Sequence, residues 1–108
     1  MGFNWNITDY GSITIADTAG TLFTLADAGM PTTMPSATKS FTGFLETAAI
    51  RARGDGTAPT TTEGQLINVG DEIILSESEI RRMQFVRTGA TSGVIKGHYS
   101  TAEPSEVT

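Results

Sequence analysis

The sequence predicts an all-β protein: a single small, jelly-roll-like β-sandwich of about seven or eight short antiparallel strands. The first observation is composition, because 18 of the 108 residues are Thr and 12 are Gly, and Thr fits a pleated sheet better than a helix. The second is that apolar and polar residues alternate over short segments, as in half-buried strands. The third is that turn-forming residues recur about every 8 to 12 residues, the spacing of sandwich strands.

The length suits one domain, which at this size buries roughly two-thirds of its unfolded surface. We expect the sandwich to span residues 11–100. In residues 1–10, Phe3 and Trp5 alternate with polar residues and Tyr10 follows, which predicts an edge strand or an arm that lies on a neighbour. Residues 101–108 are polar and acidic and are expected to form a flexible tail.

Residues 12–25 predict a hairpin. Ile13 and Ile15 alternate with polar residues, Ala19-Gly20 supplies a turn, and residues 22–25 return as a second strand. After a proline-containing loop, residues 41–53, "FTGFLETAAIRAR", are expected to form one long strand. Its alternation places Phe44 and Ile50 on one face, with Leu45 and Arg51 on the other.

The second half of the chain predicts two short strands within residues 65–76 and a closing hairpin over residues 83–100, with Gly89 at positive φ in its turn. Between them, Ser76 and Glu79 have the spacing of a capping box, which predicts one helical turn over residues 77–83. Glu77 and Arg81 would form an i,i+4 pair on that turn.

Charge and composition exclude several classes of function. The formal net charge is −5 and the pI about 4.6, which argues against nucleic acid as a partner because phosphate contacts need clustered Lys and Arg. No apolar run approaches the roughly 20 residues of a membrane helix. There is no Cys, so disulfides and thiolate chemistry are excluded. We expect synthesis in the cytoplasm.

The sequence contains no recognisable catalytic constellation, so we expect a protein that is not an enzyme and has no cofactor. His98 is the sole histidine and has no Gly-framed Ser near it, so we interpret it as a surface or interface residue. The carboxylates of Asp55, Glu63, Asp71 and Glu72 lack the spacing of a calcium loop, and no phosphate-binding glycine motif occurs. No metal site is predicted.

The tripeptide Arg53-Gly54-Asp55 occurs in integrin ligands, where it lies on an exposed loop tip with Arg and Asp pointing apart. Here it follows an alternating strand pattern. Asp55-Gly56-Thr57 is also a turn sequence in its own right, with an Asp side chain that accepts from the backbone two residues on and a Gly at positive φ. We therefore interpret the tripeptide as a strand end and turn rather than an adhesion motif.

Three segments of the chain resemble a group of small phage-encoded virion proteins: "ETAAIRARGDGTAPT", "GQLINVGDEIIL" and "FVRTGATSGVIKGHY". The resemblance covers about half of the chain, and its most specific parts are residues 55–60 and 87–90. It implies a non-enzymatic β-sandwich that decorates or cements the capsid. The implied partners are the major capsid protein and copies of this chain, with a homotrimer expected by analogy, and the implied location is the virion surface.

Under this hypothesis the interface residues fall into two groups, aromatic anchors and arginines at strand ends: Phe3, Trp5, Tyr10, Arg51, Arg53 and Arg87. The aromatics could instead pack on the domain's own core, and the arginines could pair with Asp55 or Asp71 of the same chain. A second hypothesis is a tail or fibre module that binds a receptor or glycan. It would use an aromatic platform such as Trp5 with Asn4 and Asn6.

Overall fold

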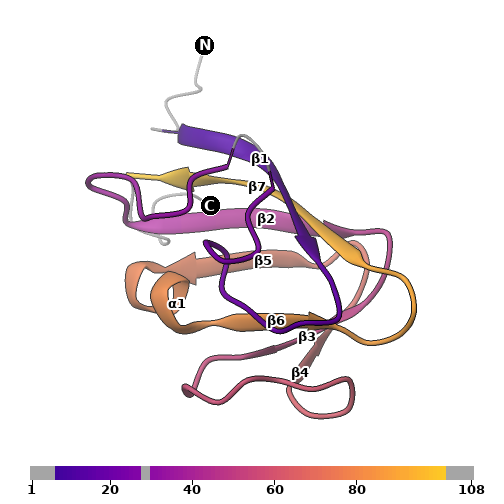
Figure 1. The fold of residues 1–108 in the computed structure, drawn as a ribbon. Helices are drawn as coiled ribbons and strands as arrows, with labels where there is room; N and C mark the ends of the chain where they lie inside the picture. The colour runs from indigo at the N-terminus through magenta and orange to yellow at the C-terminus, as the bar shows by residue number, and fades with distance from the viewer. Residues whose placement is uncertain (1–6, 28–29, 102–108) are drawn as a thin grey trace.

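A computed structural model describes residues 7–27 and 30–101, and it confirms a small all-β domain (Figure 1). The strands and the helix have these bounds: β1 Ile7–Ile15, β2 Ser40–Glu46, β3 Ile50–Arg53, β4 Gln65–Ile67, β5 Glu72–Ser76, α1 Glu77–Arg82, β6 Gln84–Arg87 and β7 Gly93–Ser100. The predictions for residues 1–6 of the arm and 102–108 of the tail concern residues outside the described part of the chain. Residues 7–10 belong to β1, which is an edge strand.

The strands form two antiparallel sheets, with orders β1-β7-β2-β5 and β4-β3-β6. Gly20 adds an eighth strand position, because it exchanges both backbone hydrogen bonds with Phe85 of β6 at 3.2 and 2.8 Å. Counting Gly20 as the second position, the orders become 1-8-3-6 and 2-7-4-5. This is the eight-position, two-sheet arrangement of a jelly roll, with its second strand reduced to a single bridge.

The core lies between the two sheets. Phe41 of β2 and Tyr99 of β7 are fully buried and meet edge to face, with ring centroids 5.1 Å apart. Gly97 lies against the Phe41 ring and the neighbouring strand β2, and a Cβ there would come within 2.7 Å of the ring and within 2.8 Å of Gly43 Cα. Glycine is therefore required at this point of β7 so that the Phe41 ring and the β2 backbone can approach closely.

The single long strand expected over residues 41–53 is wrong, because the chain forms two strands in different sheets. The break is at Thr47, which has a φ of 80° and interrupts the ladder. Odd-numbered residues such as Leu45 face the core before the break, whereas Ile50 and Ala52 face it afterwards. Phe44 therefore faces away from the core while Ile50 faces into it, contrary to the expected alternation.

Both expected hairpins are also wrong. Residues 21–25 form a turn closed by the 3.0 Å bond from Leu25 N to Thr21 O rather than a returning strand. In the described residues the expected antiparallel return is reduced to a single bridge between Ile13 and Ala26. Strands β6 and β7 belong to different sheets and pair with β3 and with β1 and β2, respectively. Gly89 is not among the residues with positive φ. Strand pairing depends on how all the strands pack in the sandwich. Turn residues do not specify it.

The helical turn is confirmed with its cap. Ser76 accepts from Glu79 N and its own backbone N–H donates to the Glu79 carboxylate at 2.8 Å, so both halves of the capping box are present. Glu77 and Arg81 form the expected ion pair at 3.6 Å. The two short strands expected within residues 65–76 are β4 and β5. They too lie in different sheets.

Candidate interaction surface

The side of the β1-β7-β2-β5 sheet that faces away from the core carries unusually large apolar groups, and we call it the outer face. Strand register places Tyr10, His98, Thr42 and Ile74 in one row across the four strands. The adjacent row consists of Ser12, Lys96, Phe44 and Glu72. Tyr10 is 67% exposed, Phe44 50% and Ile74 36%. Three large apolar side chains therefore occupy neighbouring rows of one accessible surface.

A shallow depression of about 380 Å³ lies on the outer face, lined by Tyr10, Thr42, Phe44, Glu46, Lys96 and His98 among others. Within it, Lys96 Nζ donates to Ser12 Oγ at 2.7 Å, which ties β7 to β1. Burial lowers the pKa of His98 from its ordinary value, so this imidazole is neutral at pH 7. The depression thus combines two aromatic rings, one fixed cation and a neutral histidine.

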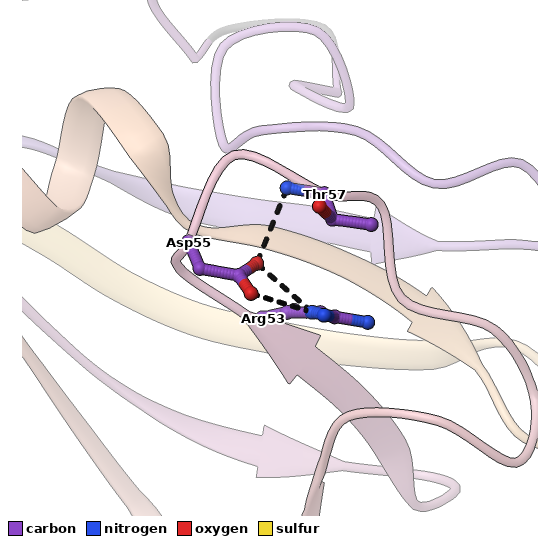
Figure 2. Close-up of polar contacts among 3 residues, drawn as sticks. All are labelled: Arg53, Asp55 and Thr57. Atoms are coloured by element: carbon purple, nitrogen blue, oxygen red, sulfur yellow. Dashed lines mark hydrogen bonds and ion pairs between the residues drawn. The ribbon is translucent and has the colours of Figure 1, made fainter.

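The Arg53-Gly54-Asp55 tripeptide forms a closed local turn. Arg53 Nε donates to both Asp55 oxygens, at 2.9 and 3.0 Å, and Thr57 N donates to Asp55 Oδ1 at 3.2 Å (Figure 2). The guanidinium lowers the pKa of Asp55, with help from the Thr57 amide, and the carboxylate raises the pKa of Arg53. Gly56 has a φ of 90°, so the expected turn is present. Arg and Asp bind one another instead of pointing apart.

The two other arginines of the predicted interface, Arg51 and Arg87, are half-buried. Arg51 Nη1 donates to the carbonyl of Gly64 at 3.0 Å, which ties the loop over residues 54–64 back to β3. Arg87 lies at the end of β6, where its backbone N–H donates to Ala16 O at 2.9 Å. Arg53 forms an ion pair with Asp55 of the same chain, as the alternative expectation allowed. Among the aromatic anchors, Tyr10 lies on the outer face, and Phe3 and Trp5 lie outside the described residues.

Phe44 and Ile74 were missed as surface residues by sequence reasoning. Phe44 had been assigned the same face as Ile50, which holds only if the strand continues unbroken through Thr47. A usable signal was present: Thr42 and Glu46 share the phase of Phe44, while Phe41 and Leu45 have the opposite phase. A face that contains Glu is the wet face of a strand.

No group of three or more His, Asp or Glu side chains in residues 7–27 and 30–101 is placed to hold a metal ion. No helix in the same part of the chain is long and apolar enough to cross a membrane. Comparison with protein-family models, curated proteins and solved structures gives no match. The site's own geometry is therefore the basis for any statement about function.

Proposed function

We propose that this chain is a non-enzymatic bacteriophage virion protein, a capsid decoration or cement protein that binds the assembled head and stabilises it. The observation that supports this most is the outer face, where Tyr10, Phe44 and Ile74 are exposed in two neighbouring rows of one sheet. Clustered exposed apolar groups mark contact surfaces more often than isolated ones do. Jelly rolls recur in viral capsid proteins, and the "DGTAPT" and "RTGA" stretches resemble small virion proteins.

The mechanism is addition of buried surface. A protein that binds the assembled shell but not its separated subunits shifts the equilibrium towards the shell by mass action. Tyr10 and Phe44 are the anchors, since aromatic residues dominate interface hot spots. Arg53 and Arg87 end strands of the other sheet, where they supply polar contacts to a neighbouring subunit, while Arg51 holds the loop over residues 54–64 in place. The partners are the major capsid protein and further copies of this chain, with a homotrimer on the virion surface.

Cosedimentation with purified heads tests the proposal. Replacing Tyr10 and Phe44 together by Ala should weaken retention on heads about tenfold or more, because each removes a large contact group. Val69→Ala is the matched control, since Val69 is 56% exposed but lies off the outer face. Failure of the unaltered protein to bind heads, or equal retention of all variants, contradicts the proposal.

A second candidate is a receptor- or glycan-binding module, as in a tail or head fibre. The specific observation in its favour is the depression on the outer face, where the Tyr10 and Phe44 rings flank Lys96, Glu46 and His98. Aromatic rings with nearby polar groups suit a sugar, and lectins also use jelly rolls. The Trp5 platform with Asn4 and Asn6 belongs to the same hypothesis. Binding to a glycan array without retention on heads would favour this candidate over the first.

A further inference from the structure

A second concave surface lies on the side of the sandwich where the edge strands β4 and β5 border the gap between the sheets. We call it the edge groove; its volume is about 370 Å³. Its floor consists of the core residues Ile73, Leu75 and Phe85 together with Met83. Leu66, 45% exposed, and Ile74 lie at its rim. Asp71, Glu72 and Glu79 give it acidic borders.

Both strands beside the groove have a free edge. Within the described part of the chain, β5 pairs with β2 alone and β4 pairs with β3 alone. The outer backbone N–H and C=O groups of an edge strand are a template for a further extended segment. A segment that added to β5 could place alternate side chains towards the apolar floor.

We propose that the edge groove binds residues 1–6 of a second copy of this chain. In "MGFNWN", Phe3 and Trp5 are two residues apart, so in an extended segment both side chains face the same way. Asn4 and Asn6 then face the other way and supply amide donors for the groove's carboxylates. The segment has no acidic residue, so it would not be repelled by the carboxylates of Asp71 and Glu72.

The C-terminal segment is a poorer occupant, because residues 102–108 include Glu103 and Glu106. These carboxylates would meet the acidic border of the groove, and like charges at short range repel. The same segment has no aromatic residue to fill the apolar floor. By charge and side-chain size, residues 1–6 therefore fit the groove better than residues 102–108 do.

Geometry favours a neighbouring copy over the same chain. Ile7 pairs with Ser100, which pairs with Ser40, which pairs with Ser76 of β5. The first residue of β1 is thus level with the last residue of β5, three strand spacings or about 14 Å away. Six extended residues span about 20 Å, so reaching the same chain's groove would require a crossing and a reversal. A segment that continues straight from β1 meets another molecule instead.

The resulting contact is head to tail, since the arm of one copy enters the groove of the next. Such an interface forms a closed ring when the rotation between copies closes, as a homotrimer requires. The contact does not depend on the proposed capsid function, because it involves two copies of this chain alone.

Trp5 is the chain's single tryptophan, so its fluorescence reports on the contact directly. Diluting the full-length protein should shift the emission to longer wavelength as Trp5 leaves the groove, in step with a fall in mass measured by sedimentation velocity. Leu66→Glu should weaken self-association about tenfold or more, by placing a charge at the rim. Val69→Glu carries the same charge change outside the groove and should associate as the unaltered protein does.

A mixing experiment distinguishes this interface from others. A copy with Phe3 and Trp5 replaced by Ala keeps its groove, while a Leu66→Glu copy keeps its arm. Each alone should be monomeric, whereas the mixture should form a one-to-one pair. The inference is overturned by monomeric wild-type protein at several hundred micromolar, by a mixture that fails to pair, or by loss of the thermal unfolding transition in the Phe3/Trp5 variant. If these variants no longer associate but still bind heads, the contact holds independently of attachment.

Discussion

The two sheets of this sandwich differ in how far the apolar side chains on their outer sides are exposed to water. On the β4-β3-β6 sheet, the loop over residues 54–64 folds back on β3, with Pro59 buried and Gly64 bound to Arg51. Val86 of β6, which alternation places on the outer side beside Arg51, is 4% exposed, whereas Leu66 in the same row on the edge strand β4 is 45% exposed. The outer face of the β1-β7-β2-β5 sheet, by contrast, leaves Tyr10, Phe44 and Ile74 accessible.

The difference shows which apolar groups serve the fold. Val86 is withdrawn from water by its own chain, so it contributes to the stability of the monomer. Ile74, Phe44 and Tyr10 on the outer face stay 36%, 50% and 67% exposed in the monomer, so they gain less from folding than a buried side chain does. Clustered accessible apolar side chains are typical of contact surfaces. Val86, buried on the outer side of the other sheet, serves as the internal reference for the following predictions.

The largest expected difference is between two phenylalanines of the same strand. Phe41 is fully buried and Phe44 is half exposed. Phe41→Ala should lower the free energy of unfolding by about 3–5 kcal/mol through lost burial and a cavity, whereas Phe44→Ala should cost about 1 kcal/mol or less. Urea denaturation of both variants measures this. Equal losses would mean that Phe44 is part of the monomer's core.

The next prediction compares the two outer surfaces directly. Val86→Ala should cost about 1.5–2.5 kcal/mol, because it removes buried methyl groups from the outer side of the β4-β3-β6 sheet. Ile74→Ala removes more atoms, yet it should cost about 1 kcal/mol or less because Ile74 is on the outer face. Thermal unfolding of the two variants in parallel gives the ranking. A larger loss for Ile74→Ala would refute the contrast between the sheets.

A smaller effect is expected in the loop over residues 54–64, which is tied to β3 by the bond from Arg51 to Gly64. Gly56 has a φ of 90° and open space where a Cβ would lie, so Gly56→Ala should cost about 1 kcal/mol through backbone strain alone. Gly89 also has open space but no positive φ. Gly89→Ala is therefore the control, and it should be neutral or slightly stabilising in the same denaturation assay.

The smallest effect concerns the Arg53–Asp55 turn and its pH dependence. The pKa of Asp55 is lowered in the folded protein from its ordinary value of 3.8. Its contribution to stability is therefore present above pH 3.8 and is lost as the pH falls through the folded pKa. Asp55→Asn should be slightly less stable than wild type at pH 7, and the gap should close in strong acid. A gap that persists in acid would show that the ion pair is not its origin.

Particular residues show how far sequence reasoning extends. The capping box of Ser76 and Glu79 and the turn at Asp55 were predictable, because each depends on partners two or three residues apart. The break at Thr47 was not, since residues 41–53 alternate acceptably on either side of it. The exposure of Phe44 was lost with that break, because a shift of one residue exchanges the two faces of a strand.

The sequence by itself determined the all-β class, the position of the helical turn and the closure of the Arg53-Gly54-Asp55 turn. Thr content, period-two alternation and short-range hydrogen bonds are local properties. They depend on residues close in sequence and not on the tertiary fold. Only the tertiary structure decided that Gly20 pairs with Phe85, that β6 and β7 separate into two sheets, and that Val86 is buried while Phe44 is half exposed. Those outcomes depend on pairing between segments far apart in the chain, and that pairing is set by how all the apolar faces are buried together.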